Sequence, residues 1–256
     1  MSEQLKRINT EDDWQSLKAF TDARIALGRT GVSIPLRESL QFKLAHAHAK
    51  DAVYSALHFD QLTITLESAG LQTHTVQSKA PNRDTYLQRP DLGRVLNHQS
   101  SQKLRELSLP ESDLSIIVAD GLSAAAVNEN AWPVIQFLIE KATAKGYSLA
   151  PIILAEQARV AIADEIGSLL KARMTIILIG ERPGLSSFDS MGAYLTFAPK
   201  PGLTDERRNC ISNIREKGLP PPLAADKIMY LIDGAFRLQL SGVMLKDTDD
   251  SSLLNQ

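Results

Sequence analysis

The sequence predicts an α/β protein with a Rossmann-like, doubly wound, mainly parallel sheet and an N-terminal helical arm. Three short apolar runs recur at regular intervals, at 114–119, 149–154 and 174–179. They do not alternate polar with apolar residues, which is typical of parallel strands buried on both faces. Helical patterns at 133–145 and 157–171 separate them. Strands that alternate with helices in this way favour a doubly wound sheet.

Weaker patterns extend this region at both ends. We expect additional strands at 72–78 and 192–197, and a last helix at 224–240 that ends before a Ser-Gly pair. The predicted Rossmann-like α/β domain therefore spans residues 58–247. A polar tail is expected at 248–256, where chain ends commonly fray.

The first 57 residues form the predicted helical arm. Apolar residues at 17, 20, 23 and 27 recur at steps of three and four before Gly28, and a second helical run covers 36–57. Between Arg24 and Lys50 the chain carries five basic residues against a single acidic one, Glu38. This basic stretch is either a solvated helical face or a docking surface for an acidic partner.

Composition limits the possible classes of protein. A chain of 256 residues can form one large domain, or one domain with a small appendage. The net charge of −2 argues against non-specific nucleic-acid binding by the chain as a whole. One cysteine cannot form an internal disulfide, which fits a reducing compartment. Because the sequence has no secretory signal and no apolar run of about 18 residues, we expect a cytoplasmic protein without a membrane segment.

Three acidic residues follow the central predicted strands, namely Asp120, Glu156 and Glu181. Ligands of open α/β sheets bind outside the carboxyl ends of the strands, so we expect these carboxylates to ring one crevice. Asp120 and Glu156 can equally cap the helices that follow them. Glu181 precedes the turn sequence Arg-Pro-Gly, with no clear helix after it, so it is the carboxylate expected to face a ligand.

Three further residues are candidates for the same crevice. The helix after the second strand has a core stripe of alanine, isoleucine and leucine, and Arg159 and Val160 lie off that stripe. They are either ordinary surface residues or the floor of the crevice beside Glu181. Cys210 lies in the polar segment 204–214 and is either a small buried side chain or part of the site.

Motifs of the common catalytic classes are missing. The sequence has no phosphate-binding loop, no dinucleotide fingerprint, no nucleophile elbow and no zinc-ligand pattern. Cys210 has no histidine partner nearby in sequence, so it is not assigned as a nucleophile. We therefore assign neither catalytic residues nor metal ligands. A stand-alone enzyme that uses Asp120, Glu156 and Glu181 on a small molecule stays the alternative interpretation.

Several segments carry a resemblance to a known family. The longest are 180–194 (GERPGLSSFDSMGAY) and 208–214 (RNCISNI), with shorter matches at 89–94 (RPDLGR), 118–123 (VADGLS) and 240–247 (LSGVMLKD). In these segments the chain resembles the small, or light, subunit of ethanolamine ammonia-lyase. The resemblance covers residues from about 22 to 247 and leaves the first twenty unmatched.

This resemblance implies an adenosylcobalamin-dependent enzyme that converts ethanolamine to acetaldehyde and ammonia. It implies a hetero-oligomer in which a large subunit carries the substrate site on a TIM barrel. The small subunit would bind cobalamin at the interface between the two. By motif match the cobalamin contacts fall on Val160, Glu181 and Cys210, with Arg159 adjacent. Glu181 would accept hydrogen bonds from amide N–H groups, Arg159 would donate to carbonyls, and the other two would pack.

The resemblance also bears on cofactor form and location. No D-x-H-x-x-G motif occurs, so no histidine is expected to replace the cofactor's own base, and adenosylcobalamin is expected base-on. No nucleic-acid or membrane partner is expected. Relatives are often enclosed in bacterial microcompartments, so the chain is expected either free in the cytoplasm or within one. A helix expected at 10–20 is either a packaging signal or a docking helix.

Overall fold

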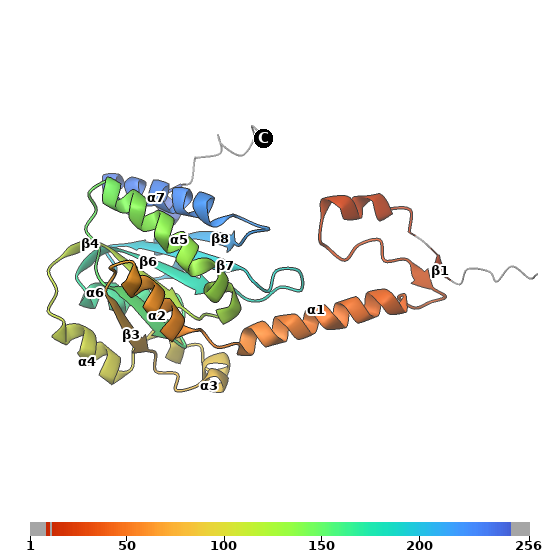
Figure 1. Ribbon diagram of the computed structural model, residues 1–256, viewed down its shortest axis with the longest axis horizontal. Helices are drawn as coiled ribbons and strands as arrows, with labels where there is room; N and C mark the ends of the chain where they lie inside the picture. The colour runs from red at the N-terminus through yellow and green to blue at the C-terminus, as the bar shows by residue number, and fades with distance from the viewer. Residues whose placement is uncertain (1–8, 11, 247–256) are drawn as a thin grey trace, which may run out of the picture.

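A computed structural model, which describes residues 9–10 and 12–246, places helices on both faces of a six-stranded sheet (Figure 1). The first four strands in spatial order run parallel, and the last two pair antiparallel with their neighbours. In that order they are β3 (Thr73–Gln77), β5 (Ile152–Glu156), β4 (Ser112–Ala119), β6 (Ala172–Gly180), β7 (Met191–Phe197) and β8 (Arg208–Ile214). The predicted α/β class with a mainly parallel sheet is confirmed.

Burial on both faces explains why the central strands lack alternation. In β4, Ile116 and Val118 belong to one apolar cluster while Ile117 and Ala119 belong to the other. The first cluster is covered by α2 (Phe59–Ser68), α5 (Ala124–Ala144) and α7 (Pro221–Leu238). The second is covered by α4 (His98–Glu106) and α6 (Ile162–Leu169). A strand between two apolar layers is therefore apolar at most positions on both faces.

Two helix boundaries differ from the sequence expectation. The helix expected to start at Pro133 starts at Ala124 instead, and Pro133 lies inside it. Proline favours the first turn, but the Ser123 side chain accepts a hydrogen bond from Ala126 N and caps the helix earlier. The helix expected at 157–171 is shorter, because residues 157–161 form the loop that closes the carboxyl end of β5.

The N-terminal segment at 12–54, which we call the arm, projects away from the sheet and its covering helices (Figure 1). The second predicted helix is confirmed as α1 (Leu36–Tyr54). The first is wrong: a 3-10 helix, η1 (Gln15–Phe20), is followed by irregular chain. The Phe20 side chain is 86% exposed, so within this chain its helical spacing has no core to pack against.

Several short elements were not expected from the sequence. They are the small pair β1 (Asn9–Thr10) with β2 (Arg29–Thr30), then α3 (Arg83–Gln88), η2 (Leu92–Arg94), η3 (Asp205–Arg207) and η4 (Gly242–Met244). A helix was expected at 10–20. Where this segment is described, it contains one strand residue, Thr10, and the 3-10 helix η1. Among described residues no helix is long and apolar enough to cross a membrane. The predicted tail at 248–256 lies outside the described residues, and the domain boundary at 57/58 stays a prediction.

Candidate functional site

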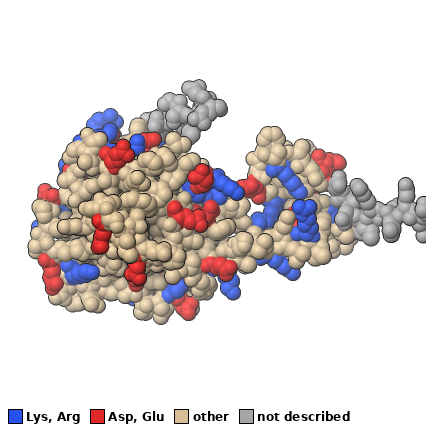
Figure 2. Space-filling model, in the orientation of Figure 1, with Lys and Arg blue, Asp and Glu red and all other residues tan. Residues whose placement is uncertain are grey.

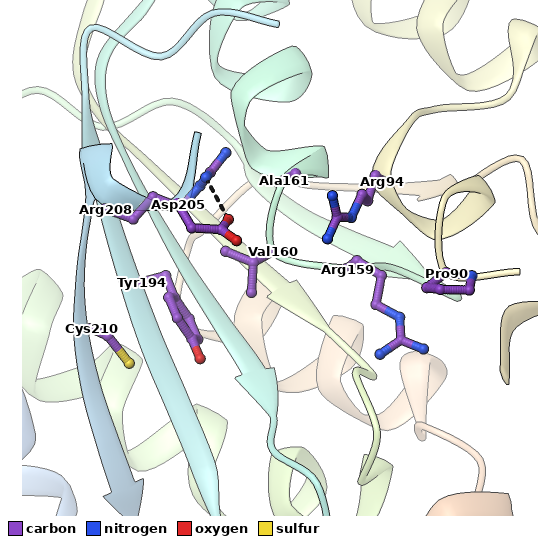
Figure 3. Close-up of a pocket in the computed structure, with 9 residues that line it drawn as sticks. All are labelled: Pro90, Arg94, Arg159, Val160, Ala161, Tyr194, Asp205, Arg208 and Cys210. Atoms are coloured by element: carbon purple, nitrogen blue, oxygen red, sulfur yellow. Dashed lines mark hydrogen bonds and ion pairs between the residues drawn. The ribbon is translucent and has the colours of Figure 1, made fainter. Parts of the chain in front are cut away.

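Two adjoining cavities lie where the carboxyl ends of β4, β5 and β6 meet, and we call them together the crevice. The first, of about 290 Å³, extends toward β8 and includes Arg208 and Cys210 in its lining (Figure 3). The second, of about 420 Å³, includes Glu181. Arg159, Val160 and Tyr194 line both cavities, so the two are parts of one open hollow.

The four residues singled out from the sequence all line this crevice. Arg159 and Val160 lie in the loop between β5 and α6, Glu181 directly follows β6, and Cys210 lies on β8. The interpretation of Arg159 and Val160 as crevice residues beside Glu181 is confirmed. Their assignment as cofactor contacts stays a prediction.

Glu181 is fixed by hydrogen bonds to one of its two carboxylate oxygens. Its Oε2 accepts from Ser190 Oγ at 2.5 Å and from Asn213 N at 3.2 Å. In the described part of the chain no donor is bonded to Oε1. Gly192 has no side chain that could crowd this oxygen, whereas a Cβ at position 192 would lie only 3.0 Å from Oε1. One carboxylate oxygen thus remains available to a ligand.

The guanidinium of Arg159 is held from behind by a buried aromatic ring. It stacks on Tyr86 at 4.2 Å from the ring centroid, and Nη2 donates to the Tyr86 carbonyl at 3.3 Å. Tyr86 is fully buried, its hydroxyl donates to Ala158 O at 3.1 Å, and burial raises its pKa. Arg159 Nε is buried without a hydrogen-bond partner. This orphaned donor marks a place where a ligand acceptor would be favourable.

Cys210 and Tyr194 form the opposite side of the first cavity (Figure 3). They are register partners on β8 and β7. The interpretation of Cys210 as a buried side chain is wrong, because β8 is an edge strand and leaves the thiol exposed. Burial raises the pKa of the Tyr194 phenol, and the nearby Cys210 and Glu181 side chains raise it further. Sequence reasoning missed Tyr194, although it ends the motif at 180–194.

The Asp120 side chain does not line the crevice as expected and instead holds two loops together. Its carboxylate is buried and accepts backbone hydrogen bonds from Gly121, Gln157 and Ala158 at 2.9, 2.9 and 3.0 Å. Arg83 Nη1 lies 3.6 Å from Oδ2. These bonds tie the end of β4 to the loop after β5. Asp120 therefore neither faces a ligand nor caps α5, whose cap is Ser123.

Glu156 does not join the crevice either. Its side chain lines neither cavity, and burial alone raises its pKa. The expectation of three carboxylates around one crevice is therefore wrong for two of them, and Glu181 is the one that lines it.

Burial of Asp120 predicts a pH-dependent contribution to stability. Burial raises the pKa of Asp120 to about 6, although the amide donors and Arg83 oppose the shift. At pH values between this raised pKa and the ordinary pKa of an aspartate, Asp120 is protonated in the folded chain and ionised in the unfolded chain. Protonation of Asp120 therefore raises the free energy of unfolding as the pH falls from 7 to 5. Burial also raises the pKa of Asp164, to about 6, so some gain is expected in every variant that keeps Asp164. Denaturant titrations should show a larger gain in the wild type than in Asp120→Asn, and a pH-independent difference between the two would contradict this.

The fold and crevice define a class of protein: an α/β chain with an open crevice at the carboxyl ends of its parallel strands. A family model described as ethanolamine ammonia-lyase light chain (EutC) matches residues 11–246. This match starts nearer the N-terminus than the resemblance found at 22–247. It covers more than half of the chain.

Curated relatives agree with this match over almost their whole length. The chain is 53% identical to the ethanolamine ammonia-lyase small subunit of Azotobacter vinelandii, covering 96% of this chain and 92% of the relative. It is 52% identical to the protein of the same name from Pseudomonas aeruginosa strain LESB58, with 98% and 93% covered. For Ralstonia nicotianae the identity is 51%, with 96% and 92% covered. The chain belongs to the ethanolamine ammonia-lyase light chain family.

Proposed function

We propose that this chain holds adenosylcobalamin in the crevice, as the small subunit of an ethanolamine ammonia-lyase whose large subunit carries the substrate site. One observation carries the proposal. Arg159, Val160, Glu181 and Cys210, which come from three separate segments of the chain, line one open hollow, and they are the positions that the family resemblance assigns to the cofactor.

The chemistry of the crevice fits a corrinoid. A corrin ring carries amide side chains that both donate and accept hydrogen bonds. Glu181 Oε1 is a free acceptor and Arg159 Nε is a buried donor without a partner, so they complement an amide N–H and an amide carbonyl. Val160 and the exposed Cys210 thiol offer packing surface between them. These residues bind and orient the cofactor, which supplies the radical chemistry when bound.

The size of the crevice supports a site shared with another chain. Its cavities of about 290 and 420 Å³ are open and comparable to pockets for drug-sized ligands, whereas a cobalamin is much larger. The crevice would therefore cover part of the cofactor and leave the rest to the large subunit.

The surface of the arm favours binding to a protein partner. Leu36, Leu40 and Leu44 of α1 are each more than half exposed. Figure 2 shows lysine and arginine side chains gathered on the same lobe of the molecule. Exposed apolar residues beside charged ones are typical of an interaction surface. We assign the large subunit as the partner that covers this arm.

The alternative, a stand-alone enzyme using Asp120, Glu156 and Glu181, lacks its required geometry. That interpretation uses the three carboxylates together at one ligand. Asp120 is committed to backbone amides, and Glu156 lines neither cavity. Only Glu181 remains, so the crevice supports binding better than catalysis by this chain alone.

Reconstitution tests this division of labour. We expect the chain alone and the large subunit alone each to release no acetaldehyde from ethanolamine with adenosylcobalamin present, and the mixture to release it steadily. The measurement is a coupled acetaldehyde assay after purification of each chain and of the co-expressed complex. Deamination by the isolated chain would overturn the proposal.

A further inference from the structure

The first cavity carries more positive charge than its carboxylates balance. Arg94, Arg159 and Arg208 line it, together with one acidic residue, Asp205. Arg208 is already neutralised, since it pairs with Asp205 at 2.9 Å and with the buried Asp164. Within the described ranges, no carboxylate forms an ion pair with Arg94 or Arg159. Two guanidinium charges at this cavity are therefore unbalanced.

These two arginines lie on the same side of the cavity, across from Tyr194 and Cys210 (Figure 3). The exposed Arg94 guanidinium has no hydrogen-bond partner within the described chain, and neither has the buried Nε of Arg159. Buried donors in folded proteins normally have an acceptor, so an acceptor on a ligand would satisfy this Nε. The unbalanced charge indicates that this ligand is an anion.

The segment at 89–94, one of the matched motifs, holds Arg94 beside Arg159. The Gly93 carbonyl accepts from Arg159 N at 2.8 Å. A Cβ on Gly93 would lie 2.9 Å from Arg159 Cγ, so only glycine permits this approach without a shift. Arg94 follows directly in η2. The close contact thus fixes where the second guanidinium enters the cavity.

We propose that Arg94 and Arg159 bind a phosphate ester in the first cavity, and that this ester is the phosphodiester of the cofactor's own nucleotide loop. Guanidinium groups match phosphate oxygens in geometry and charge. For Arg159 the phosphate therefore replaces the amide carbonyl of the corrin ring as the expected acceptor, while Glu181 keeps its amide N–H. The choice of the cofactor as the source rests on the proposed function. A separate phosphate-bearing molecule would use the same two side chains.

Corrinoids that differ in this group test the source. The complex with the large subunit would be titrated spectroscopically with adenosylcobinamide, which lacks phosphate and base, with adenosylcobinamide phosphate, and with adenosylcobalamin. We expect Arg94→Gln to weaken binding of the two phosphate-containing forms about tenfold and to leave adenosylcobinamide unchanged. Arg89→Gln is the matched control, because Arg89 lies in the same segment, pairs with Asp91 and lines neither cavity. It should leave all three affinities unchanged.

Inorganic phosphate tests the site without the cofactor. We expect phosphate to raise the thermal unfolding midpoint of the full chain and of Arg89→Gln, but not of Arg94→Gln. If this holds while Arg94→Gln binds all three corrinoids like the wild type, the phosphate site stands and the cofactor is not its source. If Arg94→Gln matches the wild type in both assays, the proposal is overturned. If the wild-type complex binds no corrinoid, the proposed function fails and the phosphate assay alone decides.

Discussion

Replacing Gly121 by alanine is expected to lower the free energy of unfolding by about 3 kcal/mol, from two separate costs. Gly121 has a φ of +57°, and its Cβ would lie 2.2 Å from Gly180 O and 2.5 Å from Ile179 Cγ1. The left-handed backbone costs about 1 kcal/mol and the overpacking up to about 3 kcal/mol. This turn lines the second cavity, so the loss would also disturb the crevice.

Gly146→Ala separates those two costs. Gly146 has a φ of +78°, but a Cβ there would meet no atom within 4 Å. It should therefore lose only about 1 kcal/mol, the cost of the left-handed backbone. Urea unfolding of the wild type and both variants measures the difference. Equal losses at the two positions would contradict the close approach of Gly121 to the end of β6.

Glu181→Gln is expected to weaken adenosylcobalamin binding by the complex about 10- to 100-fold, the range for a charge-assisted hydrogen bond. A glutamine oxygen can take the place of Oε2 and keep its bonds from Ser190 and Asn213. The NH₂ group then takes the place of Oε1 and presents a donor where the ligand amide also donates. The fold is thus kept while the acceptor is lost.

Glu216→Gln is the matched control for this prediction. Glu216 is exposed in the turn after β8 and lines neither cavity. It removes the same charge without touching the crevice, so the affinity should equal that of the wild type. Unchanged affinity in Glu181→Gln as well would remove Glu181 from the cofactor site.

The parallel core of the fold could be predicted because its signal is local. An apolar run such as that of β4 requires an apolar layer on each face, and the sequence carries that requirement directly. The edge strand β8 could not be predicted this way. Its residues Arg208, Asn209 and Cys210 are polar or small, and it forms a strand because β7 offers it an edge to pair with.

The sequence predicts a residue of the site correctly when its position at the end of a strand alone decides where its side chain lies. It fails when contacts with residues far away in the sequence decide this. Glu181 follows β6 and lines the crevice as expected. Asp120 follows β4 in the same way, but the amides of Gln157 and Ala158 turn its carboxylate inward. Arg94 enters the cavity through the contact of Gly93 with Arg159, which no sequence spacing encodes. Such placements follow from tertiary packing.

Equilibrium binding of adenosylcobalamin tests the central claim most directly. The visible spectrum of the cofactor would be followed during titration with this chain, with the large subunit, and with the complex of the two. The account predicts tight, saturable binding by the complex and much weaker binding by either chain alone, because each would cover only part of the cofactor. Equally tight binding by the large subunit without this chain would contradict it.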